Sequence, residues 1–295
     1  MDTKEQIKQI NLADRAVRVL SEGGHFRAVA VKNTMSAKTA QQKHGYSAEL
    51  ALEHAKVLAF SSLLSAFLKG EERIAIDYLS ETCKIAALYA ESMPVGEVRG
   101  YGMINENGKP DEIDGLLKVF KILYGEKEPV VGIIEAKGKH FDDVFTEYLD
   151  QSEQIPSVVK LDSIVDQDGK ILQSGGLIVQ AMPGATEEEI ADVFAKIHAI
   201  KPVTDYYLKD MRPDQMLREE LPFKFDVVQS RRIDFFCRCS KKQFLEKLKL
   251  VGLDEIKQMR EQGQNELVCR FCNEKYKLDD ADFEAIIAEL ESKKN

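Results

Sequence analysis

The sequence predicts an α+β fold made of a strand-rich N-terminal domain with a central buried helix, a helical linker, and a small C-terminal zinc-binding module. Three observations favour this organisation. Short valine- and isoleucine-rich runs alternate with turn residues through the first part, amphipathic segments broken by prolines follow, and two cysteine pairs lie near the C-terminus. We therefore expect three parts, at residues 1–184, 185–230 and 231–295.

The composition is that of an ordinary globular protein. The chain has 295 residues, of which 44% are hydrophobic and 31% charged, enough for about two domains. The N-terminal segment lacks the basic and apolar regions of a secretory signal. The most apolar segment, residues 57–68, is shorter than the roughly 20 residues that cross a bilayer. We expect a cytoplasmic location and no membrane partner.

The distribution of charge argues against a nucleic-acid partner. Residues 1–230 contain 27 Lys and Arg against 37 Asp and Glu, and residues 231–295 contain 14 against 13. Proteins that bind nucleic acids usually present a basic surface to the phosphates. The acidic body of this chain predicts no such surface.

The N-terminal domain is predicted element by element from its hydrophobic periodicity. After a polar opening segment, strands are expected at residues 25–31, 73–79, 85–90, 96–101 and 129–136, and a hairpin at residues 157–182 with its turn at 166–169. Helices are expected at residues 47–69, with Gly70 after the last turn, and at residues 141–154. Residues 115–125 fit either a helix or a strand.

The linker begins where Pro183 and Gly184 end the hairpin. Thr186 and Glu189 have the spacing of a capping box, and the helix that they start carries an apolar stripe. The stripe consists of Ile190, Val193, Phe194, Ile197 and Ile200. Prolines at 202, 213 and 222 limit the helices to short pieces, which need a surface to pack on.

The cysteine spacing predicts a zinc site. Cys237 and Cys239 form one pair, Cys269 and Cys272 form a second, and 29 residues separate the pairs. Two such pairs supply four soft ligands for tetrahedral zinc, whereas structural disulfides do not persist in a reducing cytosol. A module of this size buries little apolar surface, so a single Zn²⁺ would stabilise its fold.

The cysteine pattern "CRC…CRFCNEKY" resembles the C-terminal signature of the heat-shock protein 33 family. Further similar stretches occur in the same order: "KHGYSAE" at 43–49, "GEVRGY" at 96–101, "YLDQSEQIPSVV" at 148–159 and "SGGLIVQAMPGA" at 174–185. The family comprises redox-regulated cytoplasmic holdase chaperones. The chain departs from the family pattern around Cys83, where the family usually has a glycine-rich turn.

The resemblance implies a switch, client proteins and no enzyme activity. Oxidation by peroxide or hypochlorite would release the zinc and pair Cys237 with Cys239 and Cys269 with Cys272. The zinc module, which in this family supports the linker, would then unfold. The linker stripe would become available to unfolding client proteins without ATP, and the oxidised protein would be a homodimer.

Two other functions fit parts of the sequence. A zinc-ribbon nucleic-acid-binding accessory protein could use the basic residues of the C-terminal module, which are Arg231, Arg232, Arg238, Lys241, Lys242, Lys247 and Lys249. A thiol–disulfide oxidoreductase could use Cys269 and Cys272, but the sequence around them lacks a thioredoxin-like βαβ pattern. The motifs of nucleotide-binding loops, zinc proteases and serine hydrolases are absent. The lone Cys83 is expected to be a small buried hydrophobic residue.

Overall fold

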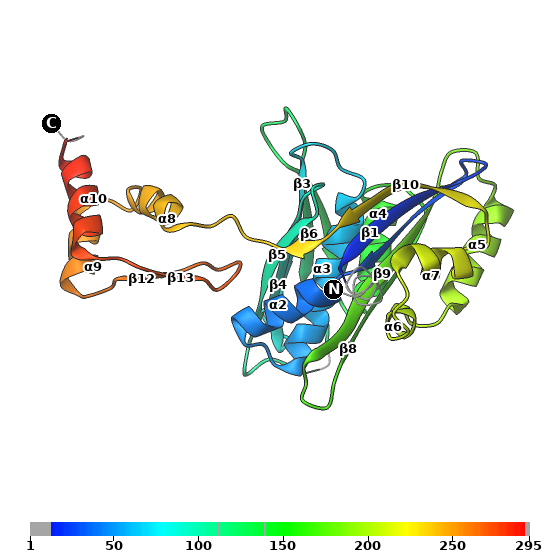
Figure 1. Ribbon diagram of the computed structural model, residues 1–295, viewed down its shortest axis with the longest axis horizontal. Coiled ribbons are helices and arrows are strands. Elements are labelled where there is room, and N and C mark those ends of the chain that lie inside the picture. The colour runs from blue at the N-terminus through cyan, green and yellow to red at the C-terminus, as the bar shows by residue number, and fades with distance from the viewer. Residues whose placement is uncertain (1–12, 111, 139, 293–295) are drawn as a thin grey trace, which may run out of the picture. The chain divides into compact units, whose positions relative to one another are not determined.

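The computed structural model describes residues 13–110, 112–138 and 140–292. The chain divides into two compact units, Met1–Phe236 and Cys237–Asn295. The α+β class expected from the sequence is confirmed by a strand-rich first unit (Figure 1). The second unit contains the cysteine cluster. Within the described ranges, no helix combines the length and the apolar character that a membrane crossing needs.

The first sheet of unit 1 has five antiparallel strands in the order β10-β1-β2-β9-β8. These are β1 Arg15–Ser21, β2 Phe26–Lys32, β8 Ser157–Val165, β9 Ile171–Ala181 and β10 Phe225–Arg232. The predicted strand at 25–31 and the predicted hairpin are confirmed. β1 was not predicted, because Arg15 and Arg18 make it look like part of a polar segment. Their guanidinium groups donate to the hydroxyl of Ser230 and the carbonyl of Ala66, partners distant in the sequence.

The second sheet of unit 1 has six strands in the order β11-β5-β4-β3-β6-β7. These are β3 Arg73–Leu79, β4 Ile85–Ser92, β5 Glu97–Ile104, β6 Leu116–Ile122, β7 Val130–Glu135 and β11 Asp234–Phe235. The four strands predicted at 73–136 are confirmed. The ambiguous segment 115–125 contains β6, which pairs with β3 and β7. β11 pairs with β5 in parallel and ends one residue before the boundary of the unit.

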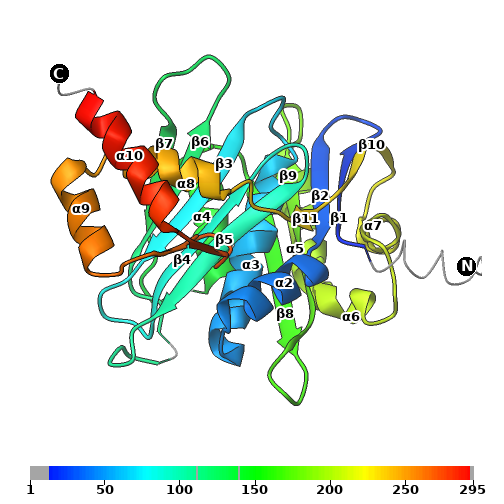
Figure 2. The same cartoon turned by 60° about the vertical axis from the view of Figure 1, so that its left-hand side comes forward.

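Helix α3, Ala48–Ser65, lies between the two sheets and is buried along most of its length (Figure 2). Its serines satisfy their hydroxyls within the core. Ser61 donates to the carbonyl of Leu58 and shares a hydrogen bond with Ser92, and Ser62 donates to the same carbonyl of Leu58. A buried hydroxyl that finds such a partner avoids most of its desolvation cost. The segment is therefore the core helix that its apolar composition predicted.

Helix α3 ends at Ser65, four residues before the predicted end, and a side chain from the first sheet binds its last carbonyls. Arg231 on β10 donates to the carbonyls of Ser62 at 3.3 Å, Ser65 at 3.1 Å and Pro94 at 2.6 Å, and to the Ser65 hydroxyl at 2.6 Å. Burial, with the like charge of Arg18, lowers the pKa of Arg231 to about 10, so it stays charged at neutral pH. A cation at a helix C-terminus also interacts favourably with the helix dipole.

Two further helices complete the core of unit 1. Helix α4, Phe141–Gln151, confirms the predicted amphipathic segment and buries five apolar residues. Helix α2, Thr34–His44, was not predicted, because its buried residues are small or polar and form no apolar stripe. Its N-cap residue Asn33 makes no side-chain capping hydrogen bond. Its first amides instead donate to the buried carboxylate of Asp14, from Met35 at 2.9 Å and Ser36 at 2.6 Å. Burial raises the pKa of Asp14 to about 6.

The linker helices α5 Glu187–Ala199, α6 Val203–Tyr207 and α7 Pro213–Glu220 pack on the five-stranded sheet, on the face opposite α3. The capping box of Thr186 and Glu189 is present. Within the stripe, Val193 and Ile197 are buried. The other three residues, Ile190, Phe194 and Ile200, are half-buried against the same cluster. The stripe therefore has a packing partner in the sheet, whereas the resemblance implied that the zinc module supports it.

Hydrogen bonds also hold α6 and the end of α5 against this sheet. Lys160 on β8 donates to the carbonyl of Ile200 at 2.7 Å, and Asp162 accepts hydrogen bonds from Thr204. The hydroxyl of Tyr207 donates to the carbonyl of Val31 at 2.9 Å. The linker is thus held by specific hydrogen bonds as well as by apolar packing.

The last part of the predicted linker is a strand. Residues 225–230 belong to β10, which pairs with β1 along the edge of the five-stranded sheet. The boundary between the compact units lies at 236/237, whereas the sequence suggested 230/231. Long-range pairing with β1 and β5 attaches residues 225–236 to unit 1.

Unit 2 contains three helices and a short hairpin within its described residues. These are α8 Lys241–Leu248, α9 Leu253–Glu261, β12 Glu266–Val268, β13 Lys275–Lys277 and α10 Asp280–Ser292. Its apolar core has only four buried residues, Ile256, Leu278, Phe283 and Ile286. A core of this size contributes little to stability, since small domains bury a small fraction of their surface.

The hydrogen bonds of Arg231 predict a strong dependence of stability on this side chain. Arg231→Met should lower the free energy of unfolding by about 2–4 kcal/mol, because buried carbonyls at the end of α3 lose charged donors. Urea unfolding followed by circular dichroism measures the change. Arg232→Met is the matched control, because Arg232 is exposed and paired only with nearby Asp234. Equal stabilities of the two variants would contradict the role of Arg231.

Candidate metal centre

The four paired cysteines converge on one point in unit 2. Cys237 and Cys239 lie between β11 and α8, and Cys269 and Cys272 lie in the loop between β12 and β13. The four sulfur atoms all lie within 4.8 Å of one another. Cys269 and Cys272 are buried, and Cys237 and Cys239 are half-buried. A cluster of four sulfurs at this spacing could hold a metal ion.

The β12–β13 loop places its two cysteines through backbone hydrogen bonds. The amide of Cys269 donates to the carbonyl of Glu274 at 2.8 Å, and the amide of Asn273 donates to the carbonyl of Cys269 at 2.7 Å. Asn273 has a φ of 57°, a left-handed conformation that asparagine tolerates better than most residues. The loop is therefore a tight turn that brings Cys269 and Cys272 to the same side.

The chemistry of the four thiols suits a cation. The sulfurs of Cys237 and Cys269 are 3.8 Å apart, and those of Cys239 and Cys272 are 3.4 Å apart. Burial raises the pKa of the thiols of Cys239 and Cys272, because desolvation disfavours the thiolate. A bound cation reverses this preference, since its charge stabilises adjacent thiolates. The donor set of four sulfurs fits Zn²⁺.

A tyrosine hydroxyl lies against the cluster. Tyr276 on β13 has its hydroxyl oxygen 3.2 Å from the sulfur of Cys239 and 3.1 Å from the carbonyl oxygen of Cys239. The hydrogen bond to Cys239 raises the pKa of Tyr276, so the hydroxyl keeps its proton. Sequence reasoning did not find this residue. The available signal was its position four residues after Cys272, in the returning strand of the hairpin.

Four of the seven basic residues predicted in the C-terminal segment, Arg231, Arg232, Lys241 and Lys249, have ion-pair or hydrogen-bond partners. Arg231 is bonded inside unit 1, and Arg232 pairs with Asp234. In unit 2, ion pairs join the helices α8 and α9 to α10. These pairs are Lys241–Asp282, Lys249–Glu289, Lys257–Glu291 and Arg260–Glu284.

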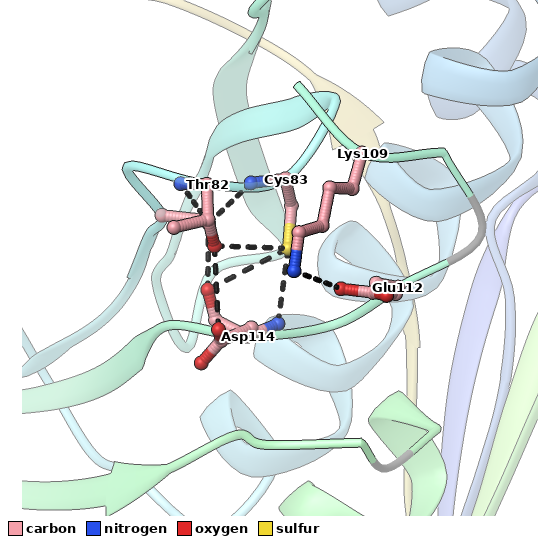
Figure 3. A network of polar contacts seen from close by, with 6 residues as sticks. Thr82, Cys83, Lys109, Glu112 and Asp114 are labelled. Atoms are coloured by element: carbon pink, nitrogen blue, oxygen red, sulfur yellow. Dashed lines mark hydrogen bonds and ion pairs between the residues drawn. The ribbon is translucent and has the colours of Figure 1, made fainter.

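The fifth cysteine, Cys83, is buried in unit 1, as expected. Figure 3 shows its polar contacts with the neighbouring loop. Its sulfur accepts a hydrogen bond from the amide of Asp114 at 3.1 Å, and its backbone bridges to Lys109. The neighbouring Thr82 hydroxyl donates to the carboxylate of Asp114 at 3.3 Å. Cys83 therefore links the loop between β3 and β4 to the loop between β5 and β6.

Comparison with known proteins identifies the family. The chain matches the Hsp33 protein family over residues 14–279. It belongs to the Hsp33 family. A 33 kDa chaperonin of Bacillus velezensis is 34% identical over 276 residues, covering 89% of this chain and 94% of that protein. A 33 kDa chaperonin of Bacillus subtilis is 33% identical with the same coverage.

A solved structure has the same fold. The 33 kDa chaperonin (heat shock protein 33 homolog) of Thermotoga maritima superposes with a TM-score of 0.84. The match covers 94% of this chain and 98% of that one, at 23% sequence identity. The resemblance seen in the sequence is thereby confirmed, and the names of the family and of its members indicate a chaperone that binds client proteins.

The geometry of the cluster predicts that replacing one of its cysteines is enough to remove most of the bound metal. Cys269→Ser should lose most of its bound metal, because serine is a poor ligand for a soft site. Elemental analysis by mass spectrometry should find one zinc ion per chain in the reduced wild-type protein. The matched control is Cys83→Ser, since the sulfur of Cys83 contacts Asp114 in unit 1. Loss of metal from the control, or full retention in Cys269→Ser, would refute the assignment.

Proposed function

We propose that this protein is a redox-regulated, ATP-independent holdase chaperone whose switch is the cluster of Cys237, Cys239, Cys269 and Cys272. The observation that carries the proposal is the convergence of these four sulfurs within 4.8 Å, in a unit with an apolar core of four buried residues. The thiols that sense an oxidant are thus the same groups that hold the unit together. The activity requires no catalytic residue.

The reduced state depends on the thiolates. Zinc bound by the four cysteines supplies positive charge and contributes on the order of 10 kcal/mol to folding. The helices α8, α9 and α10 add exposed ion pairs, each contributing about 0–1 kcal/mol. Unit 2 therefore loses most of its stability when its sulfurs cease to be ligands.

Oxidation removes the ligands in a balanced reaction. A thiolate attacks one oxygen of hydrogen peroxide, the O–O bond breaks, and a sulfenic acid and hydroxide form. A second thiolate displaces the sulfenic hydroxyl, so each peroxide accepts two electrons and yields one disulfide. We propose the pairs Cys237 with Cys239 and Cys269 with Cys272, which the family resemblance implies. Such short loops restrain the unfolded chain weakly, so the disulfides do not replace the metal.

The connecting segment of the chain would transmit the effect of oxidation from unit 2 to the client-binding surface. Cys237 directly follows Phe236, whose amide donates to the carbonyl of Val98 on β5, and β10 connects this point to the linker. We propose that unfolding of unit 2 weakens β11 and β10 and then releases α5. Release would expose the stripe of Ile190, Val193, Phe194, Ile197 and Ile200 and the sheet face beneath it.

The exposed surface would bind unfolding proteins. Side chains that are buried in the reduced state, such as Val193 and Ile197, become an apolar patch on a body with a net charge of −9. Large apolar patches bind other apolar segments, and net charge opposes aggregation of the resulting complexes. We further propose a cytoplasmic location and a homodimer in the oxidised state, as the family resemblance implies.

Activation by oxidation is the direct test. Peroxide with mild heating should release one zinc ion per chain, remove the four free thiols of the cluster and produce suppression of client aggregation. Zinc release is followed with a chromogenic chelator, and aggregation of a heat-denatured enzyme is followed by light scattering. Full suppression by the reduced, zinc-loaded protein would contradict the switch.

The linker stripe should determine client affinity after activation. Phe194→Ser should weaken binding of an unfolded client by about tenfold, because a phenylalanine side chain contributes roughly 1.5–3 kcal/mol when buried. Fluorescence anisotropy of a labelled unfolded client measures the affinity. Lys196→Ser is the control, since Lys196 is exposed and pairs with Asp192 on the same helix. Equal affinities of both variants would place the client surface elsewhere.

A further inference from the structure

The hydroxyl of Tyr276 has a defined position over the metal centre. Tyr276 lies on β13, opposite Leu267 on β12, and its ring packs against Phe244 of α8 with centroids 5.4 Å apart. Two neighbouring elements thus fix the ring. The hydroxyl oxygen lies 3.2 Å from the sulfur and 3.1 Å from the carbonyl oxygen of Cys239. One donor therefore faces two acceptors of the same residue.

The direction of the hydrogen bond follows from the chemistry of the sulfur. A thiolate has no proton to donate, so in the metal-bound state the phenol is the donor and the sulfur of Cys239 is an acceptor. A hydrogen bond to an ionised acceptor is stronger than one to a neutral carbonyl. The proton of Tyr276 therefore favours the sulfur of Cys239 when that sulfur is ionised.

We propose that Tyr276 is a positioning residue that holds the thiolate of Cys239 and slows its oxidation, an inference that rests on the proposed redox switch. The hydrogen bond withdraws electron density from the sulfur lone pair that must attack peroxide. It also fixes the sulfur in the direction of the other three ligands. Tyr276 thereby sets how much oxidant is needed before Cys239 leaves the cluster.

The size of the effect can be stated in advance. Hydrogen-bonding partners of metal ligands typically change metal affinity by about 10–100-fold. Thiolate nucleophilicity follows basicity with a Brønsted coefficient of about 0.4–0.5, so a tenfold change in basicity gives about a threefold change in rate. Loss of the hydroxyl should therefore weaken metal binding about tenfold and speed oxidation of Cys239 about threefold.

The variant Tyr276→Phe tests this with the ring retained. Peroxide oxidation is quenched at intervals, free thiols are alkylated, and mass spectrometry gives a separate rate for each cysteine. The rate at Cys239 should rise about threefold relative to the rates at Cys269 and Cys272. In the cobalt-loaded protein, the sulfur-to-metal charge-transfer band should move to longer wavelength, because the sulfur becomes richer in electrons.

Two further variants separate the hydrogen bond from packing. Tyr124→Phe removes a hydroxyl from a side chain that is 82% exposed in unit 1, and it should change neither the rates nor the band. Phe244→Leu loosens the ring contact but keeps the hydroxyl of Tyr276. It should raise the rates at all four cysteines together or leave them unchanged, without the selective effect at Cys239.

The outcomes decide between a specific and a general role. A uniform rise at all four cysteines in Tyr276→Phe, or no change in rate and band, would overturn the proposal. A rise at Cys239, and at its proposed disulfide partner Cys237, relative to Cys269 and Cys272, together with the band shift, would support it. These measurements do not depend on client binding. A wild-type protein that never suppresses aggregation would therefore contradict the proposed function, while the rate ratio would still decide the role of Tyr276.

Discussion

The convergence of four cysteine sulfurs is the constraint on which unit 2 depends. The unit has four buried apolar residues in its core, with partly buried hydrophobic residues packed against them and ion pairs between its helices. Burial by itself favours neutral thiols at Cys239 and Cys272, so the thiolate form of the cluster needs a compensating cation. Under the proposed function, the unit is stable while its sulfurs are metal-bound thiolates and loses that stability when they are oxidised.

The five-stranded sheet contributes side chains to two apolar cores, one on each of its faces. Alternate residues of β2 point to opposite faces, so that Val29 and Val31 pack around α3 while Ala28 and Ala30 pack beneath the linker helices. Removal of the linker would uncover the second face and leave the first core, with its buried helix, in place. Under the proposed function, unit 1 would thus expose an apolar surface while its first core stays folded. A chaperone that binds unfolding proteins needs such a combination of an exposed surface and a stable body.

Buried charges connect parts of unit 1 that are distant in the sequence. Asp14 supplies the cap of α2, and Arg231 binds the last turn of α3. Arg231 lies on β10, between the linker and Cys237, so the segment that leaves unit 1 for the cluster is fastened to the central helix. Burying a charged side chain costs desolvation free energy. Such a side chain is tolerated only when several hydrogen bonds compensate for that cost. In the proposed switch, Arg231 determines where the segment that leads to Cys237 is attached to unit 1.

The sequence by itself determined the α+β class, most strands, the buried helix, the capping box at Thr186 and the four cysteines that converge in unit 2. These features are encoded locally, by hydrophobic period, cap residues and cysteine spacing. The tertiary structure decided what local patterns do not contain. It showed that the linker stripe packs on the sheet, that β1 and β10 pair, that Asp14 caps α2, and that Tyr276 reaches Cys239. Each of these features depends on contacts between residues that are far apart in the chain or across a turn. No short stretch of sequence contains both partners of such a contact, so no local pattern predicts it.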